Sequence, residues 1–204
     1  MRNKIALAVT AACAMLYGAS AFAVDTPPTT GPFGTGTVTF TGTITNAPCD
    51  IQTGDENLSV NFGQVSYRAL KAADAVDNNN AKQFTIHLQN CEFDPDTSTN
   101  SGTTNPVGQM SKVQIAFSGV PAAGSKKAFI STTNTNLGVQ LLGLDGQPIT
   151  PSNTPDFSST NPTQQLQPYQ NTFTYTAKLM NVGAENSVTA GAFSIPVSYT
   201  LKYQ

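Results

Sequence analysis

Few side chains in this chain of 204 residues have the types and spacing needed for catalysis. The one histidine, His87, stands between Ile86 and Leu88 on the polar side of an alternating stretch, so we expect it to face solvent. A single histidine cannot form a multi-histidine metal site, and no nucleophile-elbow glycine signature accompanies it for a Ser-His-Asp triad. We therefore expect no catalytic residue, no metal site, no cofactor and no enzymatic activity.

Paired carboxylates are the other candidates for acid–base chemistry. Asp55-Glu56 and Asp94-Asp96 lie in turn-like sequence, where we expect solvated carboxylates and not an acid–base pair. No phosphate-cradling glycine loop follows a predicted strand. The stretch Asn57-Leu58-Ser59 matches a glycan acceptor, and we interpret it as the start of a strand.

The N-terminus reads as an export signal. Arg2 and Lys4 precede an apolar run from Ile5 to Tyr17, and Ala21-Phe22-Ala23 supplies a small-x-small cleavage pattern. The apolar run is too short to span a bilayer. We expect residues 1–23 to be a signal peptide and the rest to be one exported domain.

Two cysteines remain after that cleavage, because Cys13 belongs to the signal. Cys49 and Cys91 would enter an oxidising space, where they are expected to form a disulfide. Two free buried thiols are the alternative. A bond across this separation would stabilise the fold by roughly 4 kcal/mol on the chain-entropy model.

The charge balance excludes two classes of partner. The formal net charge is −2 and charged residues make up 11% of the chain, against about 25% in ordinary proteins. The chain therefore has neither a nucleic-acid footprint nor a polybasic membrane patch. Thr, Asn, Ser and Gln take the place of the missing charges, as in many extracellular β proteins.

Alternating apolar residues, the pattern of half-buried strands, recur along the chain. β-Branched and aromatic residues fill these runs, and Gly, Pro, Asn and Asp separate them. The seven runs are Val38–Ile44, Leu58–Phe62, Phe84–Leu88, Val113–Phe117, Leu137–Leu141, Phe173–Leu179 and Phe193–Tyr203. They predict an all-β, two-sheet sandwich of broadly immunoglobulin type.

The remaining segments are predicted to be helix, loop or tail. Alanines in Tyr67–Val76 favour a short helix. Asp94–Gln109 and Asp145–Gln170 are polar and rich in turn residues, so we expect surface loops with little to bury. Residues 24–36, with three prolines and three glycines, are expected to be extended when unpaired.

The last predicted strand poses a structural question. Its apolar face comprises Phe193, Ile195, Val197, Tyr199, Leu201 and Tyr203. A strand inside a sheet needs a neighbour on each side, and no later strand of the sequence can supply one.

Four blocks of sequence answer this question through a resemblance. GTVTFTGTITNAPCDI (36–51), NFGQVS (61–66), LQNCEF (88–93) and VTAGAFSIPVSYTLKYQ (188–204) resemble the rod subunits of chaperone-usher pili of the type 1 and P pilus kind. The resemblance implies an incomplete immunoglobulin-like β-sandwich that lacks its last strand and is completed by a donor strand from a partner. It also implies a disulfide between Cys49 and Cys91.

The same resemblance assigns roles to the two ends of the mature chain. Residues 24–36 would be a donor-strand extension, and residues 37–204 the pilin domain with an acceptor groove and chaperone-binding strand along its last six alternating residues. Within the extension we favour one inward phase, with the other phase (Thr30, Pro32, Gly34, Gly36) as the alternative. The favoured phase comprises Gly31, Phe33, Thr35 and Thr37.

The function implied is that of a structural subunit of an adhesive pilus, or fimbria. Its partners would be neighbouring pilin subunits in a homopolymer, a periplasmic chaperone and an outer-membrane usher, and a separate tip adhesin would bind the host receptor. The chain would be exported through the periplasm to an extracellular pilus on a Gram-negative cell. A minor adaptor pilin and a free secreted β-sandwich binding module are the alternatives. The absence of tryptophan and the unpartnered terminal strand argue against the free module.

Overall fold

The computed structural model describes residues 36–95, 107–132, 134–158 and 162–204. The expected signal peptide and almost all of the expected donor extension fall in residues 1–35, outside the described residues. Ile44–Gln204 form one compact unit, to which the described residues 36–43 do not belong. Within the described ranges, no helix has the length and apolar character needed to cross a membrane.

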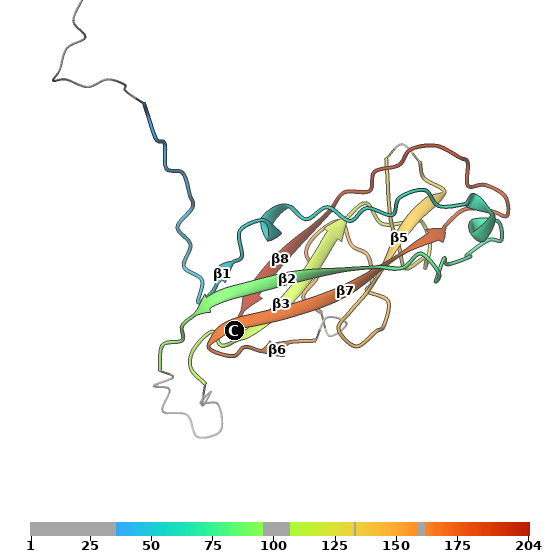
Figure 1. Ribbon diagram of the computed structural model, residues 1–204. Coiled ribbons are helices and arrows are strands. Elements are labelled where there is room, and N and C mark those ends of the chain that lie inside the picture. Colours follow the sequence, from blue (N-terminus) through green and yellow to red (C-terminus); the bar gives the residue numbers. More distant parts are fainter. Residues whose placement is uncertain (1–35, 96–106, 133, 159–161) are drawn as a thin grey trace, which may run out of the picture. The chain divides into compact units, whose positions relative to one another are not determined.

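Two antiparallel sheets build the compact unit (Figure 1). One sheet has the strand order β1-β2-β7-β5-β4, and the other has the order β6-β3-β8. The strands are β1 (Asp50–Ile51), β2 (Lys82–Cys91), β3 (Lys112–Gly119), β4 (Phe129–Ile130), β5 (Leu137–Leu142), β6 (Gln164–Gln165), β7 (Tyr169–Asn181) and β8 (Val197–Tyr203). The predicted all-β sandwich is confirmed.

Aromatic side chains join the two sheets at the centre of the core. Phe84 on β2 stacks on Tyr175 on β7, with ring centroids 5.6 Å apart. Phe117, which β3 contributes from the other sheet, meets the Tyr175 ring edge-on at 4.8 Å. Offset and edge-on pairs of this kind add to the stabilisation that burial provides. The burial also raises the pKa of the Tyr175 hydroxyl well above its usual value.

Most of the predicted strands are present. Phe84–Leu88 lies within β2, Val113–Phe117 within β3, Leu137–Leu141 within β5 and Phe173–Leu179 within β7. The terminal run is shorter than predicted, because β8 begins only at Val197. Pro196 precedes it and has no backbone N–H to give to a ladder.

Two predicted strands are absent, although their residues are described. Val38–Ile44 has no regular structure, and Phe40 is 90% exposed. Leu58–Phe62 also belongs to no strand, although Leu58 has extended backbone angles. Alternation marks residues that suit a sheet, but a strand also needs a hydrogen-bonded neighbour, and neither run has one among the described residues.

The predicted helix over Tyr67–Val76 is much shorter in the structure. Only a 3-10 helix, η2 (Tyr67–Leu70), forms there, after a second 3-10 helix, η1 (Asp55–Asn57). The side-chain amide of the buried Asn181 donates to the carbonyls of Leu70 and Ala72, both at 3.0 Å. The Leu70 carbonyl would bond to a later N–H group in a longer α-helix, and here it bonds to Asn181. The Ala72 carbonyl accepts from Asn181 and from the backbone N–H of Ala75 at 3.2 Å.

The polar loops contain more structure than their composition suggests. Within Asp145–Gln170 lie β6 and the first residues of β7, and Ile149 and Leu166 are buried. The backbone N–H of Leu166 donates to the carbonyl of Ser111 at 2.8 Å. The prediction of a surface loop with little to bury was wrong here, because single apolar residues fix the segment to the sandwich. In the other predicted loop, residues 96–106 lie outside the described residues.

Candidate functional site

The free side of β8 is the candidate site, because β8 pairs with β3 on one side only. Its inward side chains Val197, Tyr199, Leu201 and Tyr203, together with Phe193 and Ile195 before it, pack against the core but are only partly buried. The outward residues between them are exposed. On the paired strand β3, the inward residues Val113 and Phe117 are 0% and 3% exposed. The apolar face of β8 is therefore half covered.

The β3–β8 register shows which backbone groups point to the free side. Lys112 and Gln204 exchange both of their backbone hydrogen bonds, at 3.1 and 2.8 Å. In an antiparallel ladder such pairs alternate with pairs whose N–H and C=O groups point away from the partner. Val197, Tyr199, Leu201 and Tyr203 occupy the alternate positions. Their N–H and C=O groups therefore point to the free side, where the described residues supply no strand. We call this side, with its inward side chains, the open edge.

A second stretch of chain, Asp50–Phe62, lies across from the open edge, and we call it the facing segment. The Tyr199 hydroxyl donates to the carbonyl of Asp55 at 2.9 Å. Further along, the rings of Phe62 and Phe193 are 6.2 Å apart. The residue numbers rise on one side as they fall on the other, so the two stretches run in opposite directions. In Figure 1 the facing segment comprises β1 and the blue-green chain that follows it.

Among the described residues, the contacts between the facing segment and β8 all involve a side chain of one of the two. Within the described residues, no backbone hydrogen bond links Leu58–Phe62 to Val197–Tyr203. The run Leu58–Phe62 was predicted to be a strand, but it forms no ladder, and the side of β8 that faces it forms none either. An added strand could bond to the exposed backbone of β8 and cover its apolar face.

Asp55 fixes the facing segment to the sandwich. Its carboxylate accepts hydrogen bonds from the backbone N–H of His87 at 2.7 Å and from the His87 ring Nδ1 at 2.8 Å. Asp55 is only 7% exposed, so the expectation of a solvated turn carboxylate was wrong. His87 lies on the outer face of β2, as predicted. Its side chain is partly exposed and also bonds to Asp55, which the sequence did not predict. The sequence gives no signal for this pairing, because its partners are far apart along the chain.

The predicted disulfide is confirmed, and it anchors the start of the facing segment. Cys49 is bonded to Cys91 at the end of β2, with the two Cα atoms 4.1 Å apart. Both cysteines are buried, and β1 pairs with β2 directly beside them. The covalent bond therefore ties the facing segment and the central sheet together at one end of the open edge.

The predicted donor residues lie almost wholly outside the described part of the chain. Gly31, Phe33 and Thr35 precede residue 36, so their structure is not described; Thr37 is exposed. Directly after it, Val38 is 74% exposed and Phe40 is 90% exposed. Apolar side chains exposed in alternation before Ile44 form a segment suited to pairing with a sheet.

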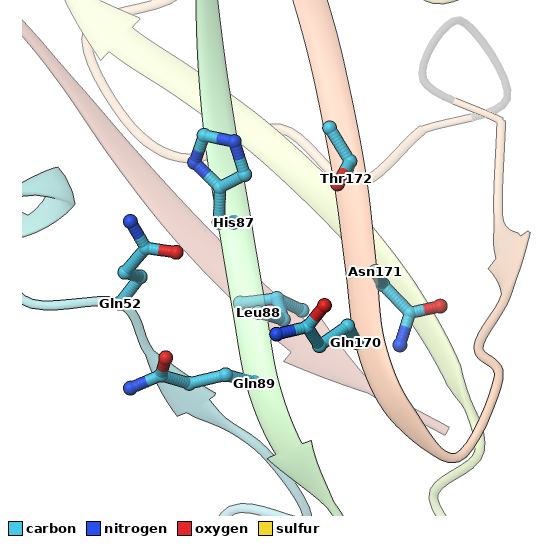
Figure 2. A pocket seen from close by; sticks show the side chains of 7 residues that line it. All are labelled: Gln52, His87, Leu88, Gln89, Gln170, Asn171 and Thr172. Atoms are coloured by element: carbon cyan, nitrogen blue, oxygen red, sulfur yellow. The ribbon is translucent and has the colours of Figure 1, made fainter.

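A small polar pocket over β2 and β7 is a less promising site. Figure 2 shows that its lining comes from both strands and from the chain after β1. It is lined by Gln52, His87, Leu88, Gln89, Gln170, Asn171 and Thr172. Asn171 already bonds to the backbone of Gln167 in both directions, at 2.7 and 2.8 Å. No His, Cys, Asp or Glu cluster of three or more that could bind a metal occurs among the residues that the structure describes.

Comparison with protein families gives a match over almost the whole described chain. The model of a family described as "Fimbrial protein" matches residues 38–204. The F7-2 fimbrial protein of Escherichia coli is 30% identical over 173 residues, which cover 85% of this chain and 87% of the relative.

Solved structures give a consistent result. A chain of a chaperone-usher pilus, solved to explain the uncoiling of its rod, is 28% identical, with a TM-score of 0.65 over 86% of this chain and 99% of that one. The P pilus rod subunit PapA is 26% identical, with a TM-score of 0.59 over 78% of this chain and all of that one (100%).

Proposed function

The chain belongs to the fimbrial protein family and is a structural pilus subunit with an immunoglobulin-like sandwich that lacks a strand, and we propose how that strand is supplied. The N-terminal segment of a neighbouring subunit lies between β8 and the facing segment and completes the sheet. The observation that carries this proposal is the open edge, where four alternate residues direct their backbone groups to a side without a strand. Polymerisation then follows from completing the fold.

We place the donor further along the chain than the extension 24–36 alone. The phase that contains Gly31, Phe33, Thr35 and Thr37 has one large apolar side chain, whereas Val38, Phe40 and Ile44 follow in the opposite phase. Those three residues are among the most exposed large apolar residues of the described chain. Burying each would contribute roughly 1.5 to 3 kcal/mol. The donor therefore extends to Ile44, with Val38 and Phe40 inward and Phe33 as the alternative inward residue.

A donor segment and an acceptor edge are different surfaces of one subunit. Contacts of this heterologous kind form a ring if the rotation between successive subunits closes, and an open filament if it does not. For a pilus subunit we propose the open filament. The family relationship supports a structural role without catalysis. Similarity to rod subunits favours the rod over a minor adaptor.

Assembly of such a filament requires that the open edge be covered before the donor arrives. We propose that a periplasmic chaperone covers it first and that an outer-membrane usher directs the exchange, with the finished pilus outside a Gram-negative cell. The exposed backbone groups and half-covered apolar face of β8 support this, since an uncovered edge of this kind promotes aggregation. Receptor binding is assigned to a separate tip adhesin.

The proposal is tested by donor variants on the full chain. Phe40→Asp should abolish the heat-sensitive, SDS-resistant ladder of polymers, because a charge would be placed in an apolar site. Phe33→Asp is the matched control and should leave the ladder intact. A normal ladder from Phe40→Asp together with a lost ladder from Phe33→Asp would show that the phase with Phe33 inward is the correct one. Normal ladders from both variants would contradict the proposed donor.

A further inference from the structure

Two tyrosines on the inward face of β8 differ in their hydrogen bonding. Tyr199 and Tyr203 are both partly buried and pack against the core. The Tyr199 hydroxyl donates to the Asp55 carbonyl at 2.9 Å. The Tyr203 hydroxyl oxygen is shielded from solvent and has no hydrogen-bond partner within the described part of the chain.

The surroundings of Tyr203 keep its hydroxyl neutral. Burial raises the pKa of Tyr203 to about 12, and the nearby Tyr199 and Asp50 add to the shift. The group therefore remains a hydrogen-bond donor at ordinary pH. A shielded donor without an acceptor destabilises a protein more than a missing hydrogen bond does, so such groups are rare in native structures.

The position of Tyr203 indicates where an acceptor can come from. Tyr203 stands on the open edge, and its own backbone groups point to the side where a strand can be added. A strand added there brings its backbone carbonyl oxygens and its own inward side chains to the side of β8 on which Tyr203 stands. The N-terminal segment is also rich in threonine, and Thr26 and Thr30 share the proposed inward phase of Val38 and Phe40.

We propose that Tyr203 is a specificity-determining residue of the open edge: its hydroxyl donates a hydrogen bond to an acceptor oxygen of the donor strand from a second copy of this chain. The acceptor is a backbone carbonyl or a threonine hydroxyl. This inference rests on the proposed function. Its consequence is that the open edge discriminates between strands of similar apolar content by whether they present an oxygen at this position.

Two matched variants test the inference in the full chain without its signal peptide. Tyr203→Phe removes an unpartnered hydroxyl, so the thermal midpoint of the unfilled subunit should rise by about 2 to 4 °C. Tyr199→Phe removes a hydroxyl that has a partner and should lower the midpoint. A labelled synthetic peptide of residues 24–44, measured by fluorescence anisotropy, should bind Tyr203→Phe about tenfold more weakly than the wild type.

Peptide variants identify the acceptor oxygen and do not depend on how well the Phe variant folds. If the acceptor is a threonine hydroxyl, Thr26→Val or Thr30→Val in the peptide should weaken binding to the wild-type subunit, because both threonines share the inward phase of Val38 and Phe40. The same change should then have little effect on the Tyr203→Phe subunit. The alternative outcome is that neither peptide change has this effect, while the wild type still binds the unchanged peptide about tenfold more tightly than Tyr203→Phe does. The acceptor is then a backbone carbonyl.

The outcomes separate this inference from the proposed function. A wild-type subunit that binds the peptide no better than a scrambled peptide contradicts donor completion itself, and the inference with it. Binding of equal strength to the wild type and to Tyr203→Phe, with equal midpoints of the unfilled subunits, overturns the inference and leaves donor completion in place.

Discussion

Strands β7 and β8 share an alternating sequence pattern but have very different surroundings. Both alternate apolar and polar residues, and both pack against the same core. β7 lies between β2 and β5, and its inward residues Tyr175 and Leu179 are 4% and 1% exposed. β8 pairs with β3 alone, and all of its inward residues remain partly exposed. The difference lies in the neighbours and not in the strand itself, and it is the reason why we propose β8 as the assembly surface.

The largest expected contrast comes from truncating one core leucine on each strand. Leu179→Ala should destabilise the subunit by about 2 to 5 kcal/mol with or without a donor peptide, because its site is already closed. Leu201→Ala should cost less in the unfilled subunit and approach that range only when the donor covers it. Urea denaturation of both variants, with and without peptide, measures the contrast. Equal losses for Leu201→Ala in both conditions would contradict it.

Removing the disulfide should destabilise the subunit, because the bond anchors the facing segment that lies across from the open edge. The double variant Cys49→Ser, Cys91→Ser is expected to lose about 2 to 4 kcal/mol of unfolding free energy. The same loss is a larger fraction of the unfolding free energy of the subunit without a donor strand, because that subunit is less stable. Urea denaturation of the oxidised and variant proteins checks this, and an unchanged midpoint would show that β1 and β2 hold the facing segment without the bond.

The carboxylate of Asp55 should matter less than the disulfide but more than a surface charge. Asp55→Ala removes the acceptor for two His87 hydrogen bonds and should destabilise the unfilled subunit by about 1.5 to 3 kcal/mol. Glu185→Gln, at an exposed position, is the control and should stay within about 0.5 kcal/mol. Similar thermal midpoints for both variants would mean that the facing segment does not depend on this contact.

The smallest expected effect is in alkaline solution. The pKa of Tyr203 is raised from 10.0 to about 12 in the folded chain, so the folded state holds its proton more tightly than the unfolded state. This contribution to stability is present below pH 10 and is lost as the pH rises towards 12. Tyr203→Phe should therefore lose less stability than the wild type over this range. Thermal midpoints across the range measure the difference, and parallel curves would contradict it.

The sequence predicts the strands that have neighbours and misplaces those that lack them. Phe173–Leu179 and Val113–Phe117 form strands as expected, because their partners lie within the chain. Val38–Ile44 and Leu58–Phe62 show the same alternation without a ladder, and periodicity contains no information about a neighbour. The missing strand was inferred from resemblance to pilus subunits, and composition alone could not have revealed it.

At the site, the residue types were predictable and the long-range contacts were not. The six inward residues from Phe193 to Tyr203 follow directly from alternation, and the structure places all of them against the core. The contacts of Asp55 with His87 and Tyr199 join residues far apart in sequence, so no local pattern indicates them.

The most direct test of the central claim is to supply β8 with its missing neighbour in the same chain. Residues 24–44, fused after Gln204 through a short flexible linker, would reach the open edge at an effective concentration of millimolar order. Thermal unfolding of the fused and unfused chains should then give a much higher midpoint for the fused chain, which should also be monomeric. Equal midpoints, with the unfused chain already a stable monomer, would show that the sandwich needs no donor and would contradict the account.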